Sequence, residues 1–416
     1  AAIQAGTGDD TFALLPGFVA SLSLDGGAGS DFLDYGNFTT PVTVDLGTGS
    51  ATNLTTLTNV ENFRAGSSVS DQFRLPAGNN LVSLTAALAG TVNSLNTFTG
   101  FETIVGNAGN DTFSLADGVN FAGTIAGGAG TGIDTLDYQL FTSPLTVDLG
   151  TIAADIEFVQ GTTNASSTLL ARNTTNTWTI ENPSRGSVSS LGFNPICFSN
   201  FDIFQGGSLD DTFVFLDGAS FAGTIAGGAG FDQLDYQGFT SPVTVDLGTL
   251  TVSDLERIQG NASLTNTLIG ANTINTWSID ALNQGVVNGL EFRAFSQLTG
   301  GNSGDVFTLN GGSVETIAGG DGNDSIIFNS GSANTIDGGL GTNNTFTDNR
   351  TANAALTISG DNQGSLDGTL PFTNIQSIQL GSGNDTITFT AGTIASVLAG
   401  DGNDQFQRSE EHTSEL

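Results

Sequence analysis

Residues 227–236 read "GGAGFDQLDY", and similar wording recurs as "GGAGSDFLDY" at residues 26–35 and as "GGAGTGIDTLDY" at residues 127–138. Each copy is followed by nearly the same apolar segment, "TTPVTVDLGT", "TSPLTVDLGT" or "TSPVTVDLGT". Near-copies of a glycine turn, an Asp and an apolar tail indicate that the repeat itself builds the fold, because repeated units bury their apolar faces by stacking on one another.

The repeat has a long and a short period. The turns "TGDDTF", "AGNDTF", "SLDDTF" and "NSGDVF" recur about every 100 residues, which predicts four repeats over residues 6–105, 106–205, 206–299 and 300–407. Within each repeat a second Asp turn follows about twenty residues after the first. We expect the four repeats to form one continuous domain, residues 1–407, since each unit of a repeat protein contacts only its neighbours.

The shorter period predicts the fold class. Alternating apolar residues, as in "PVTVDLGT" at residues 242–249, predict half-buried strands, and no segment has the apolar spacing of a helix. We expect an all-β chain with nearly no helix, folded as a right-handed parallel β-solenoid of the β-helix or β-roll kind. A string of β-sandwiches is the alternative, because such modules have about 100 residues, but the step of about twenty residues argues against it.

Two further features of the repeat bear on function. "NTWTIENPSRGSVSSLGF", from residue 176, matches "NTWSIDALNQGVVNGLEF", from residue 275. Trp178 and Trp277 are therefore repeat positions, and we expect both to pack in the core rather than to stack on a ligand. Cys197 is the one cysteine, which excludes an internal disulfide, and it is expected to be a small buried residue.

The composition limits the partners of the chain. Its 416 residues carry a formal net charge of −34, and all eight basic residues are Arg. This charge disfavours nucleic acid and anionic membranes and makes divalent cations the natural counter-charge. No apolar run is long enough to span a membrane. Residues 408–416, "RSEEHTSEL", contain the only His and resemble the translation of a sequencing adapter, so we expect them to be disordered and to lie outside the fold.

The turn "GGDGNDSII" at residues 319–327 suggests a cation site. Its glycines allow positive φ and close backbone approach, so that carbonyl oxygens can converge. Asp324 supplies a hard anionic oxygen, the ligand type that Ca²⁺ prefers, and Ile326 is expected to point inward and anchor the turn on the core. The same place in the other turns holds Phe12, Leu33, Phe113, Leu136, Phe213, Leu234, Phe307, Ile387 and Phe406.

These turns resemble the calcium-binding nonapeptides G-G-x-G-x-D-x-U-x of the hemolysin-type, or RTX, repeat family. The resemblance covers nearly all of residues 1–407 and implies a secreted chain, exported by a type I system, whose folding depends on Ca²⁺ ions bound between stacked turns. It places each pair of Asp residues about twenty positions apart on consecutive turns. The metal-binding residues that it implies are Asp10, Asp31, Asp111, Asp134, Asp211, Asp232, Asp305, Asp324, Asp385, Asp404, Gly27, Gly29, Gly228, Gly230, Gly320 and Gly322.

The sequence also departs from the nonapeptide pattern. Leu209 and Ser303 replace a glycine, Asn343 replaces the Asp in "GGLGTNNTF", and the segments opposite the turns carry no Asp motif. An alternative therefore remains open, in which the Asp and Asn side chains cap nearby backbone in the corners of the repeat. Calcium has in its favour that carboxylates stacked on a strongly acidic chain repel one another unless a cation lies between them.

The function that these observations favour is a non-catalytic one. We expect a calcium-stabilised extracellular segment of a bacterial surface or secreted protein, an adhesin-like stalk that is monomeric within a longer chain and contacts cell-surface glycans or other surface proteins. The alternative is the C-terminal calcium-folding and secretion region of an exported toxin or hydrolase. A polysaccharide lyase of the β-helix type is less favoured, because an active site should depart from the repeat whereas the acidic residues here follow it.

Overall fold

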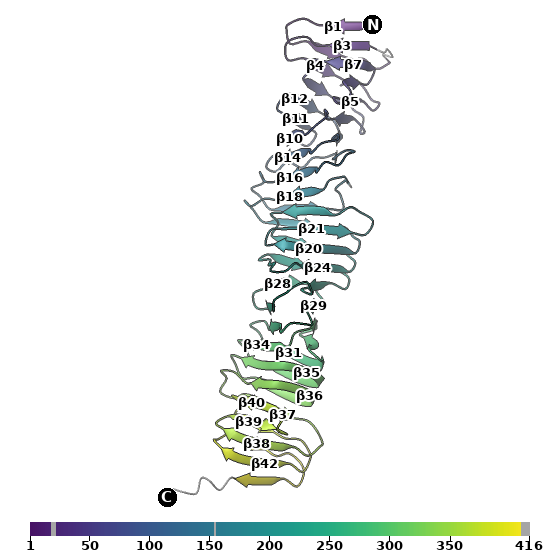
Figure 1. Cartoon of the computed structure of the whole chain (residues 1–416). Helices are drawn as coiled ribbons and strands as arrows, with labels where there is room; N and C mark the ends of the chain where they lie inside the picture. Colours follow the sequence, from purple (N-terminus) through teal and green to yellow (C-terminus); the bar gives the residue numbers. More distant parts are fainter. Residues whose placement is uncertain (18–21, 154, 409–416) are drawn as a thin grey trace. The chain divides into compact units, whose positions relative to one another are not determined.

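The computed structural model describes residues 1–17, 22–153 and 155–408 of the chain. Throughout this part the regular structure consists of strands, most of them short, without a helix (Figure 1). The chain divides into two compact units, residues 1–210 and residues 211–416. The boundary between the units falls close to the predicted start of the third repeat at residue 206.

The first unit contains the strands up to residue 205. They are β1 (Ala2–Gln4), β2 (Thr11–Ala13), β3 (Leu22–Asp25), β4 (Phe32–Asp34), β5 (Thr43–Asp45), β6 (Ser50–Ala51), β7 (Leu54–Thr58), β8 (Asn62–Arg64), β9 (Gln72–Arg74), β10 (Leu81–Ala86), β11 (Ala89–Val92), β12 (Asn96–Thr99), β13 (Thr103–Val105), β14 (Thr112–Leu115), β15 (Thr124–Ala126), β16 (Thr135–Asp137), β17 (Leu145–Asp148), β18 (Phe158–Gln160), β19 (Ser167–Leu170), β20 (Asn176–Asn182), β21 (Arg185–Ser190), β22 (Ile196–Ser199) and β23 (Ile203–Gln205).

The second unit contains the remaining strands. They are β24 (Asp211–Phe215), β25 (Thr224–Ala226), β26 (Gln233–Asp235), β27 (Thr244–Asp246), β28 (Thr251–Ser253), β29 (Arg257–Gln259), β30 (Thr267–Ile269), β31 (Thr276–Ala281), β32 (Gln284–Val287), β33 (Leu290–Arg293), β34 (Gln297–Gly301), β35 (Val306–Gly320), β36 (Ser325–Asp337), β37 (Thr345–Asp348), β38 (Ala355–Gly360), β39 (Gln363–Leu366), β40 (Leu370–Thr373), β41 (Ser377–Gln379), β42 (Thr386–Ala391), β43 (Ser396–Leu398) and β44 (Gln405–Arg408).

Strands that follow equivalent turns pair in parallel and in register. In the first unit Phe113 of β14 pairs with Leu136 of β16, which pairs with Val159 of β18, and Figure 1 shows these strands one above another. The second unit repeats the arrangement in β24, β26 and β29. The described residues form stacked parallel strands and no helix, which confirms the all-β prediction. We call one level of such a stack a rung.

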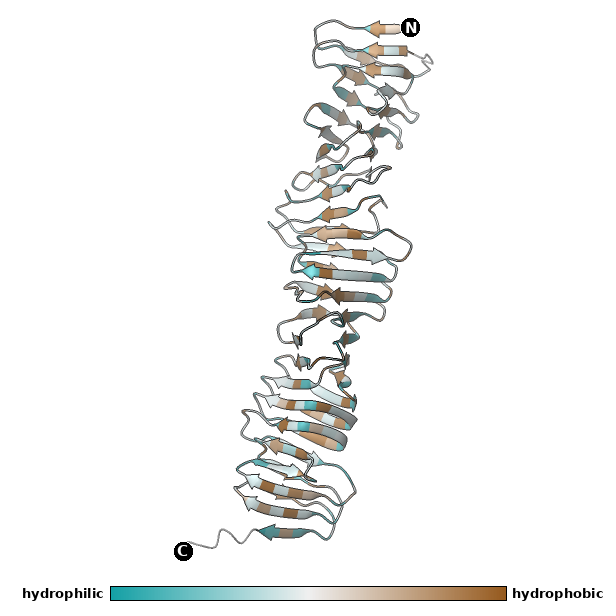
Figure 2. Cartoon of the chain, viewed as in Figure 1, coloured by the Kyte–Doolittle hydropathy of each residue, from teal (hydrophilic) through white to brown (hydrophobic). Residues whose placement is uncertain are grey.

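The side chains stacked on successive rungs form the core. Figure 2 shows hydrophobic residues alternating with hydrophilic ones along the strands, as expected for strands with one buried face. Eight of the ten predicted apolar anchors of the turns are buried, with Phe213 and Ile326 fully inaccessible to solvent. Phe12 is only half-buried and Phe406 is 63% exposed, since they lie near the two ends of the described strands.

The "NTW" segments depart from a purely parallel stack. Each forms a three-stranded antiparallel meander, as in β31–β32–β33, with the turn between β32 and β33 at Asn288 and Gly289, both at positive φ. Asn-Gly favours such a tight hairpin turn. The first strand of this meander pairs in parallel with β35 and the last with β29. The meander therefore inserts three successive levels into the stack, in the order β29-β33-β32-β31-β35. Its odd number of strands keeps β31 and β33 running in the same direction.

The predicted packing of the two tryptophans is confirmed. Trp178 and Trp277 are fully buried, and Trp277 stacks on Phe307 with ring centroids 5.2 Å apart. The prediction for Cys197 was wrong, because its side chain is exposed on β22. It alternates with Ile196 and Phe198, which take the buried face of this strand.

The end of the chain is described in part. Arg408 closes β44, where it pairs with Phe389 of β42, so the prediction of disorder was wrong for this residue. Residues 409–416 lie outside the described residues. The described part of the chain contains no helix with the length and apolar character needed to cross a membrane.

Candidate functional site

The Asp residues that the sequence singled out meet in pairs on consecutive rungs. In each pair the backbone N–H of the earlier Asp donates a hydrogen bond to Oδ1 of the later one. The predicted stacking of the turns is therefore confirmed. The pairs and their N···O distances are Asp10 and Asp31 (2.8 Å), Asp111 and Asp134 (2.8 Å), Asp211 and Asp232 (2.7 Å), Asp305 and Asp324 (2.7 Å), and Asp385 and Asp404 (2.9 Å).

The pairs belong to longer chains of side-chain to backbone bonds, which we call the Asp ladder. Its longest run lies in the second unit, where each backbone N–H donates to the side-chain oxygen of the next residue in the series. This run is Asn275 to Asp305 (2.6 Å), Asp305 to Asp324 (2.7 Å), Asp324 to Asn344 (2.8 Å) and Asn344 to Gln376 (2.7 Å).

Sequence reasoning missed several members of the Asp ladder. In several runs the last backbone N–H donates to the side-chain oxygen of a Glu or Gln. The missed acceptors are Glu61, Glu102, Glu157, Glu256, Gln376, Asp71, Asn266 and Asn344. The repeated phrases "VENF", "FETI", "IEFV", "LERI" and "IQSI" were the available signal, since each places the residue just before an apolar strand.

A second ladder runs in the opposite direction, one residue earlier in the turn. Here the side chain of one rung accepts the backbone N–H of the following rung, which explains the recurring dipeptide Asn-Asp. In the last turns, Asn403 N–H donates to Asn384 Oδ1 (2.8 Å), and Asn384 N–H donates to Asn353 Oδ1 (2.9 Å). Asn323 Oδ1 plays the same part for the amides of Thr342 and Asn343. The two ladders together tie each turn to both of its neighbours.

One assignment in the turns needs correction. The sequence places Asn343 of "GGLGTNNTF" where other turns have Asp, but the structure places Asn344 there. Asn344 is fully buried and accepts the Asp324 N–H, and Thr345 pairs with Ser325 on the neighbouring strand. The turn is therefore one residue longer than its neighbours, and exposed Asn343 takes the extra position.

The glycines serve two needs of the turn. The six predicted glycines adopt positive φ, among them Gly320 at 98° and Gly322 at 109°, a conformation that favours glycine. Gly319, which precedes them, serves close packing instead. A methyl group on Gly319 would overlap both Asp324 Oδ2 and the carbonyl oxygen of Gly338 on the next rung.

Burial changes the acid strength of the ladder carboxyls. Asp305 and Asp324 have at most 1% of their surface exposed. Burial raises the pKa of Asp324 to about 6, and the neighbouring charges of Asp305 and Asp321 act in the same direction. The pKa of Asp134 is likewise raised to about 6, chiefly by burial. The pKa of Asp305 is raised for the same reason.

The arrangement does not fit a calcium ion at these carboxyls. The ladder uses Oδ1 to hold a backbone amide, and Oδ2 lies against a glycine Cα with no room for a methyl group. Neighbouring turns also bond to each other directly, as in Asp321 N–H to Gly301 O (2.8 Å) and Leu340 N–H to Gly320 O (2.9 Å). Calcium requires six to eight oxygens at about 2.3–2.6 Å. No group of three or more Asp, Glu, His or Cys side chains gathers among the described residues. Calcium binding by the chain thus stays a prediction of the resemblance, and no role is derived through it.

Other acidic residues have structural partners as well. In the repeated phrase "VDLGT", Oδ1 of Asp45, Asp148 and Asp246 accepts the N–H two residues later, at 2.7–2.9 Å. This is an Asx turn, in which the side chain closes the corner of the chain. Arg257 pairs with Glu291 at 2.8 Å. The capping role that the sequence left open is therefore observed at these corners.

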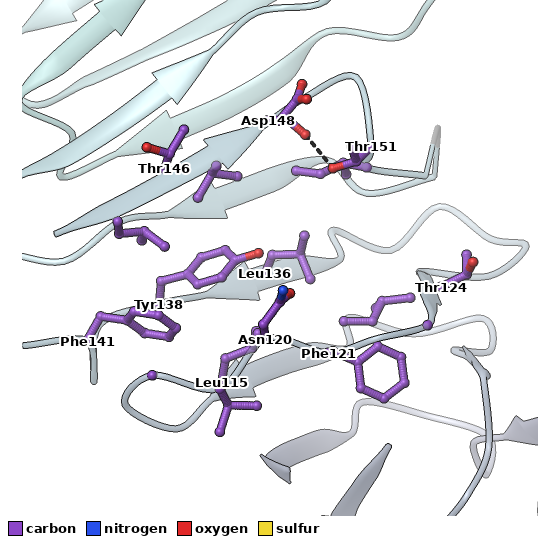
Figure 3. A pocket seen from close by; sticks show the side chains of 17 residues that line it. Leu115, Asn120, Phe121, Thr124, Leu136, Tyr138, Phe141, Thr146, Asp148 and Thr151 are labelled. Atoms are coloured by element: carbon purple, nitrogen blue, oxygen red, sulfur yellow. Dashed lines mark hydrogen bonds between the residues drawn. The ribbon is translucent and has the colours of Figure 1, made fainter. Parts of the chain in front are cut away.

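A cavity of about 330 Å³ lies in the first unit beside Tyr138 (Figure 3). Its lining mixes apolar side chains, such as Leu136 and Phe141, with polar ones, such as Asn120. At the equivalent place earlier in the unit, the hydroxyl of Tyr35 donates to the Thr52 carbonyl (2.7 Å). The connection after "VDLGT" is shorter in the copy that contains Tyr138 than in the copy that contains Tyr35.

Comparison with known proteins adds no family assignment. No protein-family model matches the chain, and no curated protein sequence matches it.

Proposed function

We propose that residues 1–407 form a non-catalytic β-solenoid segment, wound right-handed, that serves as a stalk or spacer in a bacterial surface or secreted protein. The observation that carries the proposal is the Asp ladder. Carboxyl groups are the residue type that a hydrolase or lyase would use, and here they recur at equivalent rungs and bind main-chain amides. An active site would instead be a departure from the repeat.

The hydrogen bonds of the Asp ladder also support a mechanical role. Each ladder bond joins residues on different rungs. In the five Asp pairs, and in the bonds to Glu157 and Glu256, the two residues are 19 to 24 positions apart in the sequence. A backbone amide with a side-chain acceptor on the next rung resists separation of the two rungs, because separation leaves a buried donor unpaired. A spacer needs this property along its whole length rather than at one place.

An extracellular location fits the composition. The chain has a net charge of −34 and no Lys, which favours solubility and disfavours binding to nucleic acid. The resemblance to the RTX repeats is the basis for proposing type I export. The resemblance also implies calcium-dependent folding, which the geometry of the Asp ladder does not support. Circular dichroism with calcium and with a chelator tests it, and we expect identical strand content and melting in both.

Small-angle X-ray scattering of the whole chain tests the spacer role. A compact protein of this length has a radius of gyration of about 22 Å. Rungs about 4.8 Å apart, with about twenty of them, give a length on the order of 100 Å and a clearly larger radius. Deleting residues 106–205, one predicted repeat, should shorten the particle by about a quarter. A radius near the compact value, or a deletion that leaves the length unchanged, would contradict the proposal.

A further inference from the structure

Two places in the chain have the same strand register and can be compared residue by residue. In the second unit β24 pairs with β26, in the register in which β14 pairs with β16 in the first unit. Phe215 and Tyr236 of the second unit therefore correspond to Leu115 and Tyr138 of the first. The comparison shows what fills this place in each copy of the repeat.

Three aromatic rings fill it in the second unit. Phe215 stacks on Tyr236 with ring centroids 4.6 Å apart and an angle of 19° between the ring planes. Phe239 meets the same tyrosine edge-on, with centroids 5.5 Å apart. All three side chains are buried, with at most 9% of their surface exposed. An aromatic ring of the chain itself therefore covers the face of Tyr236.

The first unit keeps two of these rings and lacks the third. Phe141 meets Tyr138 edge-on with centroids 5.5 Å apart, as in the second unit. Leu115 stands in the place of Phe215, so no aromatic ring stacks on Tyr138 among the described residues. The cavity of about 330 Å³ lies here instead, and both Leu115 and Tyr138 line it (Figure 3). An aromatic ring of a ligand can take the place of the missing side chain.

Two polar side chains of the cavity are available to such a ligand. Figure 3 shows the Tyr138 hydroxyl and the Asn120 amide directed into the cavity, and neither side chain bonds to another described residue. In the earlier copy the Tyr35 hydroxyl is already used, since it donates to the Thr52 carbonyl at 2.7 Å. Burial raises the pKa of Tyr138 to about 12, so its hydroxyl keeps its hydrogen at neutral pH and can donate it.

The charged surroundings of the cavity favour an uncharged ligand. Asp148 is the one charged residue among its described lining residues. Its Oδ1 accepts the Gly150 N–H (2.7 Å), and Figure 3 shows the carboxylate directed away from Tyr138 and Asn120. No basic side chain of the lining is present to pair with an anion, and the net charge of −34 disfavours anions further.

We propose that the cavity beside Tyr138 binds an uncharged phenol-like compound, that is, an aromatic ring that carries a hydroxyl group. The ring stacks on Tyr138 as Phe215 stacks on Tyr236, and the hydroxyl group bonds to Tyr138 and Asn120. The volume is sufficient, since an apolar cavity of about 150 Å³ already holds benzene. Mainly apolar walls with a few polar groups are typical of small-molecule sites. The site does not depend on the spacer role, because it is a departure from the repeat at one place.

An NMR titration of the full chain with para-cresol at neutral pH tests the proposal. A compound of this size should bind with a dissociation constant on the order of 1 mM. Leu115→Phe supplies the third ring of the second unit and should abolish saturable binding. Leu115→Ile keeps the size of the side chain and should leave the dissociation constant within about two-fold of the parent value. Circular dichroism confirms that each variant is folded.

Tyr138→Phe provides a second test that keeps the packing of the ring. It removes the hydroxyl group and should weaken the binding of para-cresol about 2–10-fold. The matched control is Tyr236→Phe, which removes the hydroxyl group from the covered ring of the second unit and should have no effect. Para-toluate has the same ring with a charge, and glucose has hydroxyl groups without an aromatic ring. Both should bind about ten-fold more weakly than para-cresol or not at all.

Four results would overturn the proposal. They are the absence of saturable binding of para-cresol to the parent, equal binding to the parent and to folded Leu115→Phe, equal effects of Tyr138→Phe and Tyr236→Phe, and binding of para-toluate or glucose as tight as that of para-cresol. The first two would show that the cavity is not a site for an aromatic ring. The third would show that Tyr138 does not contact the ligand, and the last would show that the site does not select an uncharged aromatic compound.

Discussion

Replacing Asn344 by Ala examines the ladder at its most completely bonded amide rung. The side chain is fully buried and makes two bonds between rungs, accepting the Asp324 N–H at 2.8 Å and donating to the Asn374 carbonyl at 3.0 Å. Alanine removes both. The neighbouring Asn343 is exposed and contributes its backbone N–H to the second ladder, a bond that alanine keeps.

The expected magnitude follows from the two groups that lose their partners. The Asp324 N–H becomes a buried donor without an acceptor, which costs about 1–3 kcal/mol. Asn374 is exposed, so water replaces part of the bond to its carbonyl. We expect Asn344→Ala to lower the free energy of unfolding of the second unit by about 2–4 kcal/mol, or its melting temperature by about 5–15 °C. Asn343→Ala should stay within about 0.5 kcal/mol of the parent.

Urea unfolding followed by Trp277 fluorescence, in the Trp178→Phe background, measures both variants. Amide hydrogen exchange provides a second readout, because loss of the acceptor should speed exchange at Asp324 more than at other amides of the same turn. Equal losses for the two variants would show that the register of the turn is assigned wrongly. A loss below about 0.5 kcal/mol for Asn344→Ala would refute the idea that the ladder stabilises the stack.

Three further changes have defined outcomes. Gly319→Ala should destabilise the second unit by about 2 kcal/mol or more, because the added methyl group overlaps Asp324 Oδ2 and the Gly338 carbonyl oxygen. The methyl group of Gly8→Ala has no atom within 4 Å, so this control should leave the melting temperature nearly unchanged. Ile326→Ala, at a fully buried anchor, should cost about 2–5 kcal/mol, while Leu340→Ala, at a residue 83% exposed, should cost little; similar losses in urea would contradict the assignment of the core. Glu157→Gln should keep the acceptor for the Asp134 N–H and preserve the free energy of unfolding at pH 7, but Glu157→Ala should lower it by about 1–3 kcal/mol. An unchanged free energy of unfolding for Glu157→Ala would show that this bond does not stabilise the fold.

The pairing of the Asp turns was predictable because it depends on local features that recur. An Asp at the same place in two turns, followed two residues later by an apolar anchor, defines a register in which Phe213 lies beside Leu234. The pattern fixes neither the lengths of the connections nor every position in a turn. Asn344 was therefore missed, because one extra residue shifts the alignment without altering the composition of the turn.

The chemistry of the turn was harder to predict than its stacking. The sequence shows an oxygen-bearing side chain at each rung, which suits a cation and a backbone amide equally well. Which of the two it binds depends on the distance between rungs and on the direction of the preceding backbone N–H, and neither can be read from spacing. The antiparallel meanders were missed for a related reason. "NTWSIDALNQGVVNGLEF" has the alternation of any strand, and only the tertiary pairing shows that β31, β32 and β33 form an antiparallel meander.

An electron-density map of the full chain crystallised at pH 8 in the presence of calcium tests the ladder most directly. The account predicts that the Asp305 N–H lies within hydrogen-bond distance of Asp324 Oδ1, that Asp324 N–H meets Asn344 Oδ1, and that the turns contact each other without an ion. Density for a cation between these turns, with both carboxyls directed at it and away from the backbone amides, would contradict the account.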